Sequence, residues 1–424
     1  MKIYRYFLFI LINMSAMSLY AQSRLMTIDE VDSIATHHNM KLQASKLDVD
    51  VAEGELSQAK KYDNPEVQLM HNIQNPINHK WFDTGYDGQT DIQLSQPIAI
   101  GGQYKNKVRQ AKAAVKACKA AYDAEVLNVK QEARLAFIDL YNAQQKLKVY
   151  DKELASVEKI HKAYEIQAEK GNISKMEAFR IATMLNQLRS ERTELSLSIN
   201  SIQKELRLML CIDDATEIEA QMDEEKAIGL VINTLAQLQS ASTQAGSAQL
   251  KTIIENHPEL AQAKYQEESA QHAIKAEKAE ALPRIAINGE WDKNGSIGHN
   301  FFAVGATISV PLWNRNQGNI KSAKAQYAQA TLEREQRQRE LQASLTENYK
   351  ATLQQLQLVE EQKKQLSDNI DQLLAAAEEQ FLKRNISVIE FVDLYSSYRD
   401  ANFMIEDGKA QLMKSYEELK KYTR

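Results

Sequence analysis

Apolar residues repeat every seven positions through a long segment in the first half of the chain, residues 103–170. One column of the repeat consists of Val108, Val115, Tyr122, Val129, Ala136, Ala143, Tyr150, Val157 and Tyr164. A second column, three residues before members of the first, consists of Val126, Ala133, Leu140, Leu147 and Leu154. Two apolar columns at heptad spacing predict a left-handed coiled coil. Residues 319–383 have a similar pattern, so the sequence predicts two helices of roughly 100 Å each.

Each long helical pattern is interrupted by a related phrase, GNISKMEAF beginning at Gly171 and RNISVIEF beginning at Arg384. Glycine in the left-handed conformation commonly ends helices, so Gly171 is expected to end the first long helix. Ser174 or Asn172 then caps the next helix, and Glu177 stands at the capping-box distance from Ser174. This phrase is therefore predicted to be the tip of a helical hairpin.

The second phrase is expected to follow the same plan. Asn385 is expected to supply the turn, because asparagine tolerates the left-handed conformation. Ser387 caps the following helix, and Glu390 stands three residues beyond it. The chain is thus predicted to contain two long helical hairpins with tips near 171–174 and 384–387.

Period-two alternation marks short segments in two proline-containing regions. In FFAVGATISVP the residues on one face are Phe302, Val304, Ala306, Ile308 and Val310. Alternation of this kind predicts β-strands. The four expected strands lie at about 65–74, 90–99, 283–292 and 301–310. Strands of about 9–11 residues are long enough to cross a bilayer when tilted.

These strands fit either a soluble sheet with one wet face or a membrane sheet. Aromatic residues at strand ends and in flanking loops favour a membrane sheet with aromatic girdles; they are Trp81, Phe82, Trp291, Phe301, Phe302 and Trp313. Four strands would leave open edges in lipid, where each unsatisfied backbone group costs several kcal/mol. Copies must therefore associate. A dimer gives eight strands with a filled interior, whereas a trimer gives a twelve-stranded β-barrel with a passage.

The two halves of the chain read as a tandem duplication. The alignment pairs Leu42 with Leu260, Pro65 with Pro283, Pro97 with Pro311 and Asn172 with Asn385. Each half reads as a helix, two strands and a long helical hairpin. The expected organisation is a signal peptide at 1–21, a first repeat at 22–211, a collar segment at 212–250 and a second repeat at 251–424. The fold class is mainly α with a small β part.

Composition and charge exclude several classes of protein. Lys2, Arg5 and the apolar run that follows them predict a secretory signal peptide. The net charge of −5 gives no basic surface for nucleic acid. Two cysteines, each in a helical pattern, form no disulfide framework. No nucleophile elbow, P-loop, HExxH or CxxC motif is present, so we expect no catalytic activity, no cofactor and no metal site.

The sequence resembles the TolC-like outer membrane efflux proteins over about 28–422. The tip phrases YEIQAEKGNISKMEAFRIATMLNQ and FLKRNISVIEFVDLYSSYRDANF are the most specific features of this resemblance. The strand-to-helix junctions QPIAIGGQYKNKVRQA and SVPLWNRNQGNIKSA look especially like the CzcC/CusC-type branch, which is associated with heavy-metal efflux.

The resemblance implies a homotrimer with a barrel in the outer membrane of a Gram-negative cell and a helical tunnel in the periplasm. It implies three further partners: outer membrane lipid, a periplasmic adaptor and an inner-membrane pump, with the RND type expected. Such a channel is a passive exit duct from the periplasm to the exterior.

The resemblance also implies roles for residues near the tips. The positions that match the family's periplasmic gate are Glu390 and Asp393, which share a helix face, and their first-half equivalents Glu177 and Arg180. Six crowded carboxylates around a threefold axis would raise some of their pKa values and favour cations. Arg180 is expected to pair with an acidic neighbour. The residues expected to dock the adaptor are Gly171, Asn172, Ile173, Ser174, Asn385, Ile386 and Ser387.

The cargo remains open between heavy-metal cations, drugs and proteins secreted in one step by a type I system. A secreted coiled-coil scaffold is a further alternative. It is disfavoured because a scaffold does not need four alternating strands of membrane length.

Overall fold

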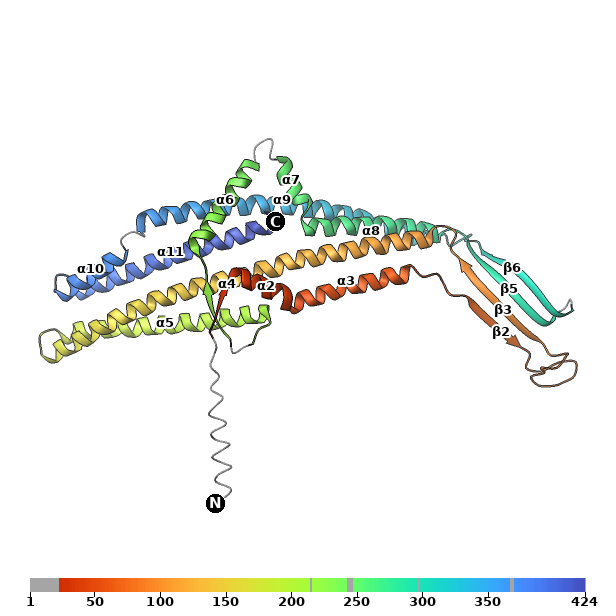
Figure 1. The fold of residues 1–424 in the computed structure, drawn as a ribbon, viewed down its shortest axis with the longest axis horizontal. Helices are drawn as coiled ribbons and strands as arrows, with labels where there is room; N and C mark the ends of the chain where they lie inside the picture. The colour runs from red at the N-terminus through yellow and green to blue at the C-terminus, as the bar shows by residue number, and fades with distance from the viewer. Residues whose placement is uncertain (1–22, 214–215, 242–246, 296–297, 367–369, 424) are drawn as a thin grey trace, which may run out of the picture. The chain divides into compact units, whose positions relative to one another are not determined.

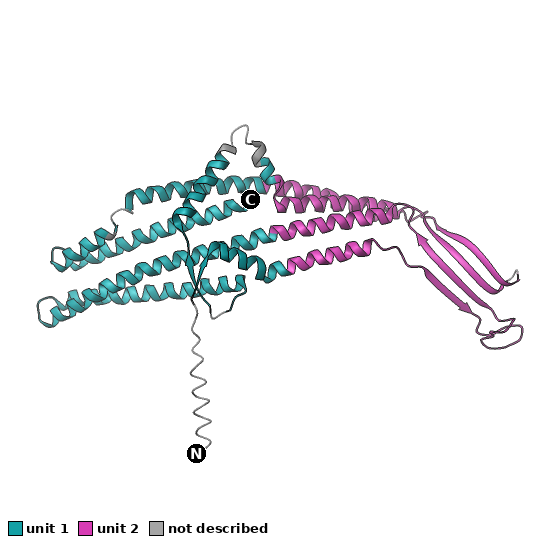
Figure 2. Ribbon diagram, viewed as in Figure 1, with its two compact units in different colours: residues 1–43, 125–254, 341–424 teal, residues 44–124, 255–340 magenta. Residues whose placement is uncertain are grey.

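A computed structural model describes residues 23–213, 216–241, 247–295, 298–366 and 370–423. The predicted signal peptide, 1–21, lies outside these residues. The chain forms two compact units, coloured separately in Figure 2. Unit 1 comprises 1–43, 125–254 and 341–424, and unit 2 comprises 44–124 and 255–340. The predicted class, mainly α with a small β part, is confirmed.

Unit 2 contains a four-stranded antiparallel sheet with the order β2-β3-β5-β6, shown in Figure 1. Its strands are β2 (Glu66–His71), β3 (Thr90–Ile98), β5 (Arg284–Gly295) and β6 (Gly298–Ser309). The central pair joins the two halves of the duplication, because β3 pairs with β5 in a register that places Ile92 opposite Trp291. Strands β2 and β6 are the two edges of the sheet.

Three helical segments and one complete helix make up the rest of unit 2. The segments are parts of α3 (Met40–Ala59), α4 (Gln103–Glu169) and α9 (Gln317–Leu366), and the complete helix is α8 (Pro258–Glu280). Helix α8 begins with proline at its first position, where the missing N–H costs nothing. The Gln103 side chain donates a hydrogen bond of 3.0 Å to the Ala279 carbonyl and so ties the start of α4 to α8.

Unit 1 contains the two helical hairpins. The first is formed by α4 and α5 (Lys175–Leu210), and the second by α10 (Ile370–Leu382) and α11 (Val388–Thr423). Residues 367–369, between α9 and α10, lie outside the described residues. Every residue in the two predicted heptad columns is buried or half-buried in the structure. The heptad pattern therefore identified the packed face of α4 correctly.

A hydrophobic cluster, which we call the hairpin core, joins the two hairpins near their tips. Its buried members are Tyr150, Leu154, Val157, Ile160, Ile181, Leu185, Leu188, Leu374, Phe381, Val388, Phe391, Tyr395 and Tyr398. The ring centroids of Phe381 and Phe391 stand 3.9 Å apart, and Phe391 is 4.6 Å from Tyr395. The Phe381 ring also stacks on Tyr164 of α4, with the centroids 5.0 Å apart, so the cluster holds α10 against both α11 and α4.

Unit 1 also contains elements that the sequence analysis missed. Strand β1 (Ser23–Thr27) pairs in parallel with β4 (Glu217–Gln221). Strand β1 has no alternation; β4 does alternate, with Ile218 and Ala220 buried, but it has only five residues. The pairing also joins positions far apart in the chain. Helices α2 (Ile28–His38), α6 (Glu224–Ala241) and α7 (Ser247–Glu255) complete the unit. Among the described residues, no helix has both the length and the apolar character needed to cross a membrane.

Candidate functional site

The first hairpin tip is a glycine-terminated helix end. Gly171 has φ +75°, in the left-handed region. The amide of Asn172 donates to the carbonyl of Gln167 at 2.9 Å, and the amide of Gly171 donates to the carbonyl of Ala168 at 3.1 Å. This pair of hydrogen bonds is a Schellman-type ending. The predicted role of Gly171 is confirmed.

Helix α5 then begins with a complete capping box. The Met176 amide donates to Ser174 Oγ at 3.1 Å, and the Ser174 amide donates to Glu177 Oε2 at 3.2 Å. The predicted cap is therefore Ser174, not Asn172. Ile173 is half-buried, whereas Ser174 and Glu177 are exposed. The backbone of the tip is thus satisfied internally, and its polar side chains remain at the surface.

The second tip corrects one prediction. Arg384, not Asn385, occupies the left-handed position, with φ +63°. The reason is the register of the motif: the left-handed residue precedes the asparagine at both tips, so Arg384 occupies the position of Gly171. Asn385 uses its side chain instead, donating to Gln380 Oε1 at 2.6 Å. Aligning the two phrases by their asparagines would have identified Arg384.

Ser387 and Glu390 form the expected cap of α11. The Ser387 amide donates to Glu390 Oε2 at 2.7 Å, and the Glu390 amide donates to Ser387 Oγ at 3.3 Å. Hydrogen bonding to this carboxylate, first from the Ser387 backbone and then from the Ser387 side chain, lowers the pKa of Glu390. Within one chain the direction is therefore opposite to the rise expected from crowding in an assembly. Glu390 keeps its negative charge at neutral pH.

The two tips touch each other. Arg384 Nη2 donates to the Asn172 carbonyl at 3.4 Å. Ile386 is half-buried and packs against the hairpin core. The structure thus brings the two predicted docking segments, 171–174 and 385–387, together at one end of unit 1.

The predicted gate residues are only partly brought together. Arg180 lines a groove of about 410 Å³ between α5 and α11, together with Val388, Val392 and Arg399. In the described part of the chain no ion pair of Arg180 is found, and its pairing with an acidic neighbour stays a prediction. Asp393 is exposed on α11, one turn after Glu390.

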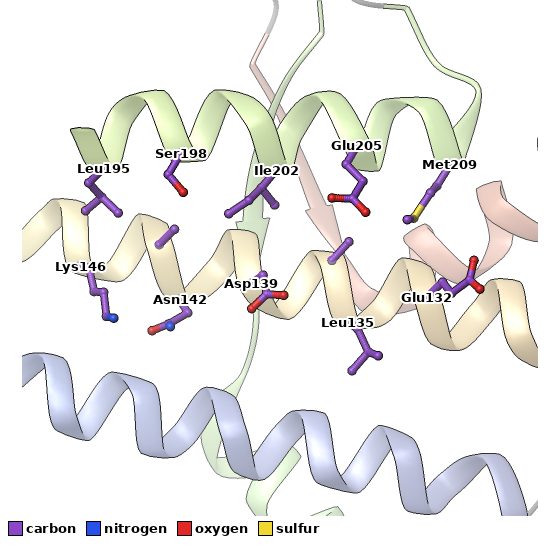
Figure 3. Close-up of a pocket in the computed structure, with 12 residues that line it drawn as sticks. Glu132, Leu135, Asp139, Asn142, Lys146, Leu195, Ser198, Ile202, Glu205 and Met209 are labelled. Atoms are coloured by element: carbon purple, nitrogen blue, oxygen red, sulfur yellow. The ribbon is translucent and has the colours of Figure 1, made fainter. Parts of the chain in front are cut away.

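A second groove, of about 510 Å³, runs between α4 and α5 (Figure 3). Its α5 side presents Leu195, Ser198, Ile202, Glu205 and Met209. On the α4 side, Asn142 and Lys146 point toward α11 in Figure 3 and bind Asp407, at 2.8 Å and 2.6 Å. These polar groups are used to join helices.

The described residues include one cluster of carboxylates that are close enough to share a cation. Asp91 on β3 and Glu290 and Asp292 on β5 have oxygens within 4.8 Å of one another. Asp91 and Asp292 are opposite each other in the sheet register. The Gln89 side chain already donates to Asp292 Oδ1 at 3.0 Å. The sequence analysis missed this cluster because its residues come from two distant strands.

The sequence analysis also missed a buried charged residue, Glu153 on α4. It approaches Arg399 of α11, far away in the sequence. A glutamate within a heptad pattern gives little indication of burial. One signal could have identified the pair of Glu153 and Arg399: each is a charged residue beside a column of core residues, and the two lie on different helices.

Comparison with known proteins finds a matching family, similar sequences and similar solved structures. Residues 33–211 and 249–423 match the family described as outer membrane efflux protein. The cobalt-zinc-cadmium resistance protein CzcC of Cupriavidus metallidurans is 20% identical over 299 residues, which are 70% of this chain and 66% of that protein. The outer membrane efflux protein BepC of Brucella suis is 22% identical over 311 residues, 70% of this chain and 64% of that protein. The chain thus spans less than two thirds of either relative.

Solved structures show the same fold. The outer membrane channel CmeC of Campylobacter jejuni aligns with a TM-score of 0.76 at 14% identity, covering 93% of this chain and 85% of that one. The two family matches fall on the two repeats expected from the duplication.

Proposed function

The chain belongs to the outer membrane efflux protein family, and from that premise we propose that it is the exit duct of a tripartite efflux system for heavy-metal cations. Family membership places the chain in the outer membrane. The cargo, the assembly and the partners are the proposed elements. Two observations support the metal cargo: the similarity to a cobalt-zinc-cadmium resistance protein and the chemistry of the α11 start.

The observation that carries the proposal is the ionised carboxylate of Glu390 beside the tip. Hydrogen bonds from Ser387 lower its pKa, so that the charge persists at neutral pH. Asp393 presents a second exposed carboxylate on the same helix face. In a threefold assembly these residues would form rings of negative charge, which select for cations in pores.

A trimer is supported by the two open edges of the sheet. Among the strands that the structure describes, β2 and β6 have no partner on their outer sides. They carry strongly exposed apolar residues, including Leu69 at 67% and Val304 at 86% exposure. Edge-to-edge association of copies would satisfy the backbone groups of both edges. Three copies would bring together twelve strands and enclose a water-filled passage.

The proposed partners meet the tips. Residues 171–174 and 385–387 present exposed polar groups and one half-buried isoleucine each, Ile173 and Ile386. We propose that they dock a periplasmic adaptor, which connects the duct to an RND-type inner-membrane pump. The two tips form one continuous docking surface because Arg384 bridges them.

The test is the ion selectivity of the purified full-length protein in planar bilayers. Replacing both Glu390 and Asp393 with their amides should shift the reversal potential in a salt gradient toward zero. The matched control is Glu194→Gln, which removes an exposed carboxylate from α5. Unchanged selectivity in the double variant would contradict the charge-ring assignment, and the absence of any conductance would contradict the duct.

The cargo is tested in cells. A strain lacking the gene should become more sensitive to cobalt, zinc or cadmium ions, and the wild-type gene should restore tolerance. Sensitivity to organic drugs alone, or the loss of a secreted protein, would replace the metal cargo with one of those alternatives.

A further inference from the structure

Glu153 is a buried carboxyl group in the contact between the two hairpins. It lies on α4 between Tyr150 and Leu154, two members of the hairpin core, and is 1% exposed. Neither of its carboxylate oxygens has a hydrogen-bond partner among the described residues. A buried carboxylate without hydrogen bonds is strongly disfavoured in its charged form. The proposed duct and docking surface do not use this residue.

The one cation near Glu153 in the described part of the chain is shared. Arg399 of α11 has its Nη1 atom 4.0 Å from Glu153 Oε2 and 3.0 Å from Glu191 Oε2 of α5. The Tyr150 hydroxyl donates to the same Glu191 oxygen at 3.3 Å. Arg399 is therefore engaged mainly by Glu191. One guanidinium faces two carboxyl groups, and Glu153 is the more distant and more deeply buried of the two.

The other titratable groups that face this region add negative charge or are neutral. Asp400 of α11 acts on Glu153 with like charge. The Tyr395 hydroxyl of α11, which interacts electrostatically with Glu153, donates to Ser156 Oγ at 2.7 Å and also contacts Glu378 of α10. The groups around Glu153 from α4, α5, α10 and α11 are thus Tyr150, Glu191, Glu378, Tyr395, Arg399 and Asp400.

These surroundings favour a neutral Glu153. Burial is the largest cause of the change, Arg399 opposes it, and Glu191 and Asp400 add to it. The net effect of these groups is to raise the pKa of Glu153 to about 8. The carboxyl group therefore holds a proton at neutral pH in the packed structure.

We propose that Glu153 is a proton-binding residue that couples the packing of the two hairpins to pH. The protonated form stabilises the packing of α4 and α5 against α11 that is seen here. Loss of the proton leaves a second carboxylate with only a shared arginine, and the charge is relieved when water enters between the hairpins. Because the contact adjoins the tips, an alkaline periplasm would loosen the end of unit 1 that carries the docking surface.

Proton linkage sets the direction in which pH changes the stability of the hairpin packing. The pKa of Glu153 is about 8 in the packed state and about 4.5 when the group is exposed. The stabilisation from the bound proton is fully present below about pH 4.5 and is lost as the pH rises through about 8. Between about pH 6 and pH 8 the equilibrium constant for local opening should rise about fifty-fold, and it should level off above about pH 9.

The experiment is hydrogen exchange, followed by mass spectrometry, on the full-length protein in detergent. The peptides of interest cover 150–160 and 388–400, and rates are corrected for the intrinsic pH dependence of exchange. Wild-type protection should fall across about pH 6 to pH 9, whereas Glu153→Gln should stay protected and show no such fall. The matched control is Glu158→Gln, which removes an exposed carboxylate on the same helix and should behave as wild type.

A second readout does not depend on a variant. Infrared spectra of the wild-type protein should show a protonated carboxyl band at neutral pH that disappears near pH 8 to 9. Absence of that band at neutral pH, or an equal loss of protection in Glu153→Gln, would overturn the proposal. Neither readout requires conduction. Failure of the proposed duct would therefore leave this result standing, and only an effect of pH on conductance rests on that function.

Discussion

Replacing Arg134 with methionine should destabilise unit 1 more than any exposed charge substitution. Arg134 lies on α4 and has 6% of its side chain exposed. Its Nε atom donates to Asp32 Oδ1 of α2 at 2.6 Å, and its Nη1 atom donates to Glu417 Oε2 of α11 at 2.5 Å. The Glu417 side chain is 6% exposed and the Asp32 side chain is 14% exposed. One buried guanidinium thus ties three helices together.

The loss of stability in Arg134→Met is set by the carboxylates that lose their partner. Removing one partner of a buried ion pair costs about 3–5 kcal/mol, because the remaining charge is uncompensated. Glu417 keeps Lys420 at 3.0 Å, so Asp32 carries most of the loss. With an unfolding entropy of about 2.1 cal/mol/K per residue, a loss of about 4 kcal/mol lowers the midpoint of this 424-residue chain by about 4–5 °C.

The assay is thermal unfolding in detergent, followed by circular dichroism. The control is Arg189→Met, which breaks the exposed pair of Arg189 and Glu158, whose side chains are 54% and 50% exposed. Exposed pairs contribute less than about 1 kcal/mol, so the control should shift the midpoint by about 1 °C at most.

A rescue variant separates charge from packing. Adding Asp32→Asn to Arg134→Met removes the unpaired charge and should restore part of the lost stability at neutral pH. The reasoning would be refuted if Arg134→Met melted within about 1 °C of the Arg189→Met control. It would also be refuted if adding Asp32→Asn restored none of the lost stability.

Two further predictions concern the tips. Gly171→Asp should abolish adaptor binding and export without lowering the melting temperature, whereas Gly171→Asn should retain adaptor binding and export. The melting temperature should hold because each side chain tolerates the left-handed backbone and a Cβ added at Gly171 meets no atom within 4 Å. Normal export by the aspartate variant would remove the docking assignment. Ser387→Ala should cost the start of α11 about 1 kcal/mol, seen as faster amide exchange in 388–391 than in a Ser397→Ala control. The pKa of Glu390 is lowered in the folded protein, so the same amides in wild type should lose protection as the pH falls through that depressed pKa. Equal exchange rates in wild type, Ser387→Ala and Ser397→Ala would contradict the cap.

Local patterns predicted the features that depend on local physics. The heptad columns identified the packed face of α4 because side chains seven residues apart lie on nearly the same side of a helix. Ser174 and Glu177 were recognised as a cap because a capping box is formed within four residues. The resemblance to outer membrane efflux proteins was confirmed by the family match over both repeats.

Predictions failed where a short motif allowed two registers. Asn385 was expected to take the left-handed turn, but Arg384 takes it and Asn385 binds Gln380 with its side chain. Propensity favours asparagine over arginine at such a position. The hydrogen bonds of the whole helix end decided otherwise, because they fix which residue follows the last turn.

By itself, the sequence determined the long helices, their tips, the alternating strands and the duplication, since each is recorded in the spacing of neighbouring residues. Only the tertiary structure decided that β1 pairs with β4, that Arg134 is shared by Asp32 and Glu417, and that Glu153 is buried beside Arg399. These contacts join positions far apart in the chain. Their energies depend on burial and on the number of charges that meet, which a linear pattern of residues does not contain.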